Sequence, residues 1–402
     1  MRHYLVIIHR WSGLVMAAFL IVVGLTGALL PFSDPLERLI NPQLFARAPA
    51  GARPLDLATL AERAEAQEPR ARVAYFGLTI PDQVSIHVVP RKDPRTGKDF
   101  QLDFDHVLLD PFTGAELGRR MEGDLTQGRI NIVPFILTLH ESLAMGNAGA
   151  WVLGVVALLW TLDCFLALYL TLPRGLPDFG RRWIPAWLVK KTSNSFRLNF
   201  DLHRATGLWM WPMLLVFAWS SVMFNLEPVY DAVTRTLFDY TPIEESLRTL
   251  QPSHPNLNPK LNWSAAQARG VELVAEQAHI QGFHIVRPFG LAYLPELGVY
   301  DYDVRTDRDV GGRTFEAGVW LDGNTGALQK VFPPLGPRSG DAITTWLYAL
   351  HWADFHDLLA YRIFVSALGL LTVGLSVTGI VIWWIKRRAR LYARTLRERR
   401  VS

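Results

Sequence analysis

Four long apolar segments alternate with regions of mixed polarity along the chain. Crossing the hydrocarbon core of a bilayer takes about 20 residues of apolar helix, and each segment provides this length. The pattern predicts a membrane α-helical protein with four long transmembrane helices. These helices are expected at 1–32, 135–172, 203–227 and 347–385.

Short basic stretches indicate how these helices cross the membrane. Residues 173–202 are predicted to form a cytoplasmic loop and residues 386–402 a basic cytoplasmic tail, because Lys and Arg concentrate in cytoplasmic flanks. Together with Arg2 and Arg10, they place both termini in the cytoplasm. No small-residue cleavage site follows the first apolar run, which favours a retained span over a removed signal peptide.

The two remaining regions, 33–134 and 228–346, then lie on the outer side of the membrane, and they have similar patterns. Each begins with a predicted helix, at 57–67 in the first and at 263–278 in the second, and continues with strand-like runs. Each region is therefore expected to form an α+β unit. The strands are predicted at 73–80, 84–89, 100–109, 283–287, 291–294, 299–305 and 316–321.

Matching turns show that the chain is a tandem duplication. Both outer regions end in Asp-x-x-Thr-Gly, beginning at Asp110 and at Asp322. In such a turn the Asp side chain bonds to the following backbone and the Gly supplies a positive φ. Each half is thus a span, an outer unit and a second span, and repeats of this kind build sites where the two copies meet.

Four histidines occupy matched positions in the two halves. His9 and His203 each begin a His-Arg-x-x-Gly-Leu motif, and His140 and His351 each follow a leucine near the start of a second span. Ionisable residues in or at the rim of a membrane are costly and are functional candidates. The topology predicts an inner pair, His9 with His203, and an outer pair, His140 with His351. Two histidines on facing helices suit bis-imidazole ligation of a haem iron.

Other readings of these and neighbouring residues remain open. A single histidine at a membrane rim is more often an interfacial polar group than a ligand, but the duplication favours ligands. Arg10 and Arg204 are either cytoplasmic anchors or partners of haem propionates. Arg362, three helical turns after His351, has the same two readings. His356 is a second-choice ligand.

Asp163 is the one acidic residue in the apolar part of the second span. In that setting an aspartate must be protonated, paired or hydrated, so both proton handling and a structural hydrogen bond are open. Counted along the second span at 1.5 Å per residue, the two histidine levels lie about 40 Å apart. That distance is long for direct electron transfer between two irons.

Composition narrows the cofactors and partners. The net charge of +4 comes from the basic flanks and signals topology, not nucleic acid. The single cysteine, Cys164, excludes an intramolecular disulfide and a cysteine-based zinc or iron–sulfur site. No Cys-x-x-Cys-His motif is present, so any haem is held non-covalently. No nucleotide-binding motif is present either, so electrons are expected from quinol in the bilayer or from a separate cytoplasmic reductase.

The histidine motifs, the Asp-x-x-Thr-Gly turns and the ending Thr-Gly-Ile-Val-Ile-Trp-Trp at 378–384 resemble the PepSY-associated transmembrane helix family over nearly the whole chain. That resemblance, to FoxB-like and PiuB-like members, implies a bacterial inner-membrane protein with two haem b groups and two PepSY-like periplasmic domains. It implies reduction of ferric siderophores in the periplasm and release of iron. The four histidines would be the haem ligands. Asp163-Cys164 departs from the usual Ser/Thr-Gly, which bears on helix packing or redox tuning.

Two other functions compete with a ferric-siderophore reductase. One is a non-enzymatic PepSY membrane protein whose outer domains bind a peptide, a protease or a siderophore. The other is a general haem electron shuttle that serves a different periplasmic acceptor. A reducible b-type haem spectrum separates the first alternative from the reductase, and reoxidation by ferric siderophores separates the second.

Overall fold

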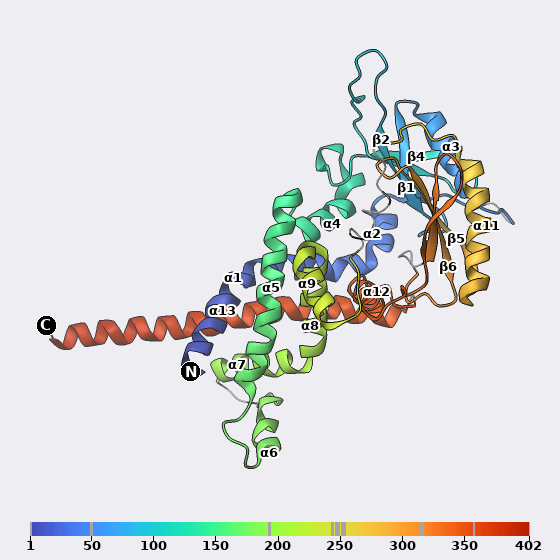
Figure 1. Ribbon diagram of the computed structural model, residues 1–402. Helices are drawn as coiled ribbons and strands as arrows, with labels where there is room; N and C mark the ends of the chain where they lie inside the picture. Colours follow the sequence, from blue (N-terminus) through green and yellow to red (C-terminus); the bar gives the residue numbers. More distant parts are fainter. Residues whose placement is uncertain are drawn as a thin grey trace. The chain divides into compact units, whose positions relative to one another are not determined.

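The chain folds into two compact units (Figure 1). The first, here called the membrane unit, comprises Met1–Pro31, Ile136–Tyr230 and Leu359–Ser402; the second, the sheet unit, comprises Phe32–Phe135 and Asp231–Leu358. The computed structural model describes residues 2–48, 51–191, 194–242, 245, 250, 255–312, 317–356 and 358–401.

Long apolar helices make up the membrane unit. Three described helices are long and apolar enough to cross a membrane, and a fourth span exists if the bent pair α7 and α8 counts as one. The pair bends by 70° at a break beside Pro212, since proline removes a backbone donor and disfavours a continuous helix. The principal helices are α1 (Arg2–Leu29), α5 (Gly146–Thr171), α7 (Ser195–Trp209), α8 (Trp211–Asn225) and α13 (Leu359–Val401).

Shorter helices connect these elements or belong to the sheet unit. The α-helices are α2 (Ser33–Ile40), α3 (Leu57–Gln67), α4 (Ile132–Ser142), α6 (Phe179–Trp183), α9 (Glu227–Leu237), α11 (Trp263–Gln281) and α12 (Ser339–His351). The 3-10 helices are η1 (Leu30–Phe32), η2 (Pro42–Leu44), η3 (Leu125–Gln127), η4 (Arg129–Asn131) and η5 (Ile184–Ala186).

The second and fourth predicted spans are broken, as is the third, which differs from the continuous helices expected at 135–172, 203–227 and 347–385. Leu143 and Ala144 have positive φ between α4 and α5, and Ala353 and His356 have positive φ between α12 and α13. A left-handed residue cannot continue a right-handed helix and is costly for L-amino acids. The helices that carry His140 and His351 are therefore separate from the helices that cross the membrane.

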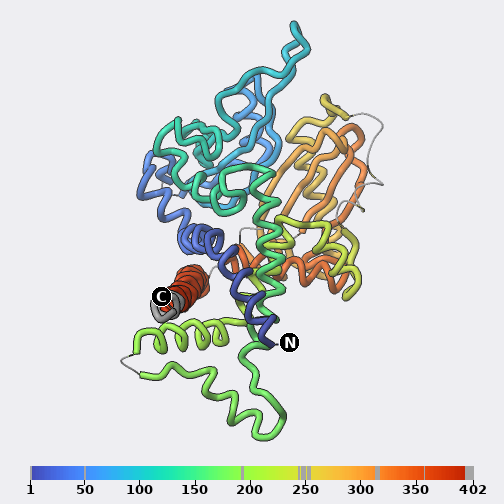
Figure 2. Tube along the Cα trace, turned by 90° about the vertical axis from the view of Figure 1, so that its left-hand side faces the viewer, coloured from blue at the N-terminus to red at the C-terminus, as the bar shows by residue number. Residues whose placement is uncertain are grey.

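Helix packing in the membrane unit follows the duplication. Helix α1 packs on α13, and α5 packs on α8, so each pair joins the first span of one half to the second span of the other (Figures 1 and 2). A Cβ at Gly369 would lie 2.7 Å from the carbonyl oxygen of Gly24, and one at Gly154 would lie 2.6 Å from that of Asn225. Small residues thus let both pairs of backbones approach closely, as is common between membrane helices.

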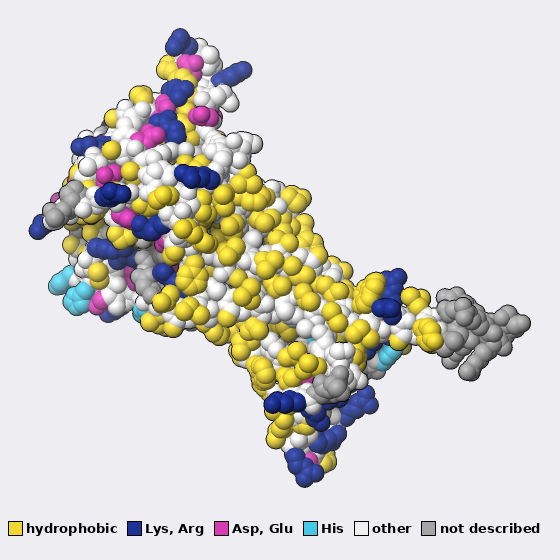
Figure 3. Space-filling view, turned by 180° about the vertical axis from the view of Figure 1, so that it is seen from behind, with side chains coloured by type: hydrophobic (Ala, Val, Ile, Leu, Met, Phe, Trp, Pro, Cys, Tyr) yellow, Lys and Arg dark blue, Asp and Glu magenta, His cyan; other side chains and the backbone are white. Residues whose placement is uncertain are grey.

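The outside of these helices is apolar. Trp151, Leu162 and Phe165 of α5 are each more than half exposed. Figure 3 shows hydrophobic side chains gathered over the helices, with Lys and Arg gathered beyond them at one end. A surface this apolar is abnormal for a soluble monomer, and it identifies a membrane protein.

The sheet unit is built on one antiparallel sheet of eight strands in the order β4-β3-β2-β1-β5-β6-β7-β8. Each half of the duplication supplies four strands, and β1 pairs with β5 to join them. The sequence predicted two α+β units; the structure merges their strands into one sheet. The strands are β1 (Ala71–Gly77), β2 (Val84–Pro90), β3 (His106–Leu109), β4 (Glu116–Arg120), β5 (Ile285–Leu294), β6 (Val299–Thr306), β7 (Ala317–Asp322) and β8 (Leu328–Phe332).

Most predicted strands are present, with three kinds of difference. The run predicted at 100–109 is a strand only at β3, from His106 to Leu109. The runs at 283–287 and 291–294 belong to the single strand β5, which stays continuous across two irregularities in its pairing with β6. Strands β4 and β8, after the Asp-x-x-Thr-Gly turns, were not predicted. Both are short and carry polar residues, so alternation of apolar residues could not reveal them.

Helices α3 and α11 pack against the sheet and share its hydrophobic core. The predictions at 57–67 and 263–278 are confirmed, with α11 three residues longer. Asp56 and Asn262 cap the two helices, each accepting a hydrogen bond from the backbone three residues on. The core includes Leu60, Ile86, Leu273, Tyr302 and Leu321.

Both predicted turns are confirmed. The Asp110 side chain accepts a hydrogen bond from the backbone of Phe112 at 2.7 Å, and Asp322 accepts one from Thr325 at 2.8 Å. Gly114 and Gly326 have φ of 67° and 70°. Glycine takes up this left-handed conformation without a steric penalty, so the same local chemistry forms both turns.

Strand β6 carries two neighbouring carboxyl groups, the half-buried Asp301 and the buried Asp303, on the face opposite Tyr302. Burial raises the pKa of Asp301 to about 6, and burial beside Asp301 raises the pKa of Asp303 well above its usual value. A folded-state pKa above the unfolded value stabilises the fold at low pH. This contribution is lost as the pH rises through about 6.

We therefore expect the sheet unit of the unaltered protein to unfold at a lower temperature at pH 8 than at pH 5. The loss is at least about 1 kcal/mol, and replacing both groups, Asp301→Asn with Asp303→Asn, is expected to remove it because amides do not ionise. Thermal melts followed by circular dichroism at both pH values test this. Asp99→Asn, at an exposed position, is the control, and an unchanged pH dependence in the double variant would contradict the prediction.

Candidate functional site: a histidine pair between membrane helices

His9 of α1 and His203 of α7 face each other in the membrane unit. Their ring centroids are 6.3 Å apart, and the ring planes make an angle of 54°. An imidazole nitrogen binds a transition-metal ion at about 2 Å, so two rings on opposite sides of one ion have centroids about 6 Å apart. The spacing of these rings would therefore allow both to bind one metal ion.

The His9 ring is oriented by Asp163 of α5. Its Nδ1 lies 2.9 Å and 3.0 Å from the two carboxylate oxygens of Asp163. The Ser12 hydroxyl, one turn along α1, donates to the same carboxylate at 3.0 Å. A carboxylate only accepts hydrogen bonds, so Nδ1 of His9 carries the proton and Nε2 is the nitrogen available to a ligand.

The His203 ring is oriented by α13. Its Nδ1 lies 3.1 Å from the carbonyl oxygen of Leu375 and 3.0 Å from the hydroxyl of Thr378. That hydroxyl already donates to the Gly374 carbonyl at 2.7 Å, so both groups act as acceptors toward His203. Nδ1 therefore carries the proton here too. This tautomer, fixed by an acceptor behind the ring, is the one usual for a metal-binding histidine.

His140 of α4 has the same kind of partner on α1. Its Nδ1 lies 3.0 Å from the hydroxyl of Thr26, which donates to the Val22 carbonyl at 2.9 Å. A Cβ on Gly27 would lie 2.9 Å from Cε1 of His140. The ring thus lies directly against the backbone of α1, and the glycine makes room for it.

The three histidines are held by short dipeptides, two of which are Thr-Gly. Thr26-Gly27 holds His140, Thr378-Gly379 holds His203, and Asp163-Cys164 holds His9. An offset of 215 residues relates Asp163 to Thr378, and the same offset relates the close-packed Gly154 to Gly369. Sequence reasoning missed Ser12, Thr26 and Thr378. The repeated Thr-Gly dipeptide was the available signal.

The distance between the two histidine levels is shorter than the sequence suggested. The partner of His140, Thr26, lies 17 residues after His9 on the unbroken helix α1, which corresponds to about 25 Å. The expected distance of about 40 Å assumed a rise of 1.5 Å per residue along one continuous second span. The second span is broken between α4 and α5, so its residues do not add up to one straight helix.

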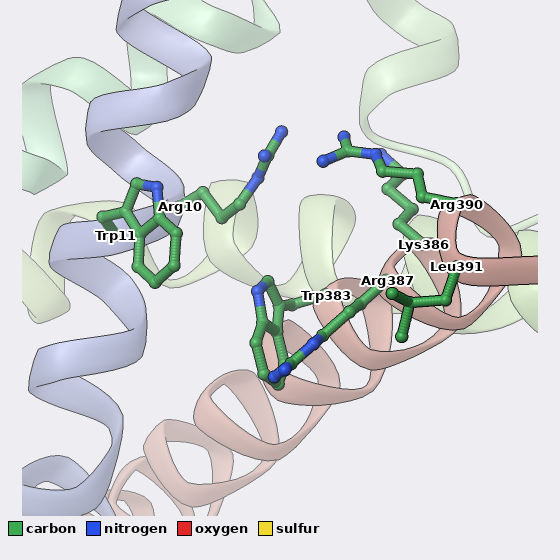
Figure 4. Close-up of a pocket in the computed structure, with 7 residues that line it drawn as sticks. All are labelled: Arg10, Trp11, Trp383, Lys386, Arg387, Arg390 and Leu391. Carbon is green, nitrogen blue, oxygen red and sulfur yellow. The ribbon is translucent and has the colours of Figure 1, made fainter. Parts of the chain in front are cut away.

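Arg10, next to His9, lines a cavity between α1 and α13 of about 470 Å³. Figure 4 shows the side chains of Arg10, Lys386 and Arg390 extending toward one another across this space. Within the part of the chain that the structure describes, no carboxylate forms an ion pair with any of these three cations. The cavity therefore favours an anion. Its full lining is Arg10, Trp11, Trp383, Lys386, Arg387, Arg390 and Leu391.

The other arginine candidates have different surroundings. Arg204 is held by the buried Asp201 at 2.9 Å and by the carbonyls of Pro185 and Ala186. These contacts tie Arg204 to the loop before α7. Both of its predicted roles, cytoplasmic anchor and propionate partner, stay predictions. Arg362 is half-buried in the first turn of α13.

Two histidine candidates lie in the sheet unit. His351 is the last residue of α12 and belongs to the sheet unit, whereas His140 belongs to the membrane unit. The pairing of His351 with His140 therefore stays a prediction from the duplication. His356 follows in the turn, is exposed, and lies edge-on to the ring of Phe355. It remains a second-choice ligand.

The set of donor atoms also tests the fit of a haem. Among the described residues, no group of three or more His, Cys, Asp or Glu side chains could hold a metal ion. The site around His9 and His203 thus offers two imidazoles and no further protein ligand. This arrangement suits a metal that brings its own equatorial ligands, as haem iron does.

The family profile of the PepSY-associated TM region matches residues 6–386. The chain therefore belongs to the PepSY-associated transmembrane family. No curated protein matches the chain.

Proposed function

We propose that this membrane protein is a haem-binding oxidoreductase that reduces ferric siderophores and so releases their iron. The observation that carries the proposal is the placement of His9 and His203, whose ring centroids are 6.3 Å apart. Each ring has its Nδ1 bound to an acceptor from another helix. Bound non-covalently at two levels, haem b would supply one-electron carriers across the membrane.

The residues of the chain have distinct tasks in this proposal. His9 and His203 hold one iron and His140 a second, with His351 as its other ligand by the duplication. Asp163, Thr26 and Thr378 orient the rings. The cavity at Arg10 is proposed to receive haem propionates, because convergent arginine and lysine side chains bind carboxylates.

The basic flanks support electron transfer from the cytoplasm to the periplasm. Both termini and the loop at 173–202 are proposed to lie in the cytoplasm of a bacterium, with the sheet unit in the periplasm. Electrons are then proposed to come from quinol or from a cytoplasmic reductase. The ferric iron of the siderophore gains one electron and becomes ferrous, which hard oxygen ligands hold less tightly.

A spectroscopic experiment tests the proposal. The purified full-length protein is expected to show a b-type haem spectrum that dithionite reduces, and a ferric siderophore is expected to reoxidise it. A folded preparation that binds no haem would support the non-enzymatic alternative and overturn the proposal. Reoxidation by other acceptors but by no ferric siderophore would instead support the general electron shuttle.

A further inference from the structure

The two halves of the duplication differ at the residue behind one proposed ligand. Thr378 in the second half and Asp163 in the first occupy equivalent positions, and each contacts Nδ1 of a histidine. His140 likewise contacts a threonine, Thr26. Among these three described contacts, only His9 has an acidic partner.

The contact between Asp163 and His9 is well oriented. Both carboxylate oxygens lie within 3.0 Å of Nδ1, and Ser12 donates to one of them. The aspartate is buried in an otherwise apolar stretch of α5. An acidic side chain in this position is costly in a membrane, and the histidine and serine offset the cost by binding it.

The chemical consequence concerns the electron density at the other ring nitrogen. A carboxylate is a stronger acceptor than a hydroxyl or a carbonyl, so it draws the Nδ1 proton and makes Nε2 a stronger electron donor. A stronger donor stabilises ferric iron more than ferrous iron. The reduction potential of the bound iron therefore falls.

We propose that Asp163 is a positioning residue that lowers the reduction potential at the His9–His203 site below that at the His140 site. This inference rests on the proposed function, because it requires an iron at both sites. Within that scheme, the difference in potential favours electron flow from the His9–His203 site toward the His140 site. The asymmetry between the two halves then gives a duplicated scaffold one preferred direction.

Asp163→Asn in the full-length protein is the principal test. The amide keeps the shape and accepts a weaker hydrogen bond, so the lower of the two midpoint potentials is expected to rise. A tenfold change in the ferric-to-ferrous affinity ratio corresponds to about 59 mV for one electron, and a rise of this size is expected. Spectroelectrochemical titration measures both potentials, and the higher one is expected not to move.

Ser12→Ala is the second variant, and its expected effect has the opposite sign. Ser12 donates to the carboxylate, so removing it leaves Asp163 a stronger acceptor for His9, and the lower potential is expected to fall. Thr161→Ser serves as the control, because Thr161 lies on the same helix α5 and its hydroxyl donates to the Ala157 carbonyl; neither potential is expected to move. A purely structural role for Asp163 would not produce shifts of opposite sign in the two variants.

The outcomes separate this inference from the proposed function. Two haems whose potentials are the same in Asp163→Asn and in the unaltered protein would overturn the inference and leave the proposed function intact. If Asp163→Asn binds no haem at the His9–His203 site, Ser12→Ala decides: an unchanged lower potential there overturns the inference. Absence of haem from the unaltered protein would overturn both.

Discussion

Replacing His203 with alanine is expected to leave one haem per chain instead of two. His203 is one of two imidazoles at its site, and no third donor from the described residues can replace it. Ferric-siderophore reduction is expected to fall by more than about 100-fold, because loss of a direct ligand exceeds the usual effect of losing an outer partner. The haem-to-protein ratio and the rate of reoxidation by a ferric siderophore measure the two effects.

His3→Ala provides the matched control for this experiment. His3 lies on the same helix as His9, is exposed, and contacts the ring of Tyr4. It is expected to retain both haems and full activity. A His203→Ala protein with two haems per chain would show that the pair His9 and His203 does not hold an iron.

Gly27→Ala is expected to damage the His140 site, whereas Gly379→Ala is expected to be tolerated. A Cβ on Gly27 would lie 2.9 Å from Cε1 of His140, too close for the ring to stay hydrogen-bonded to Thr26. A Cβ on Gly379 would lie 3.4 Å from Cε1 of His203, which is close to ordinary van der Waals contact. We expect the haem affinity of the His140 site to fall by about tenfold or more in Gly27→Ala.

Titration of haem-depleted protein with haemin measures the affinity of each site. The two glycines follow threonines with the same role, so the substitutions are chemically matched and differ in the space around the ring. Equal haem affinities in the two variants would contradict the packing of His140 against α1. A loss confined to Gly379→Ala would contradict the assignment of both contacts.

Much of the architecture follows from local patterns in the sequence. Helix α3 and the turns at Asp110 and Asp322 match their predictions, because caps and turns depend on residues only a few positions apart. The breaks after α4 and α12 were not predicted. Their left-handed residues, Leu143 and Ala353 among them, carry no local signature of a break.

The sheet shows a different limit of sequence reasoning. Periodicity indicated two similar groups of strands, and both groups are present. The pairing of β1 with β5, near Tyr75 and Ala292, unites them. Alternation of apolar residues indicates which face of a strand is buried, but not which other strand pairs with its edge. The single eight-stranded sheet could therefore not be predicted.

The sequence by itself determined the apolar spans, the duplication and the four matched histidines. Only the tertiary structure decided how three of those histidines, His9, His140 and His203, are held. His9 bonds to a residue 154 positions away, His140 to one 114 positions away, and His203 to one 175 positions away. Hydropathy shows that a helix enters the membrane, but helix packing decides which side chain lies behind an imidazole. Asp163 is the partner of His9 because α5 packs beside α1.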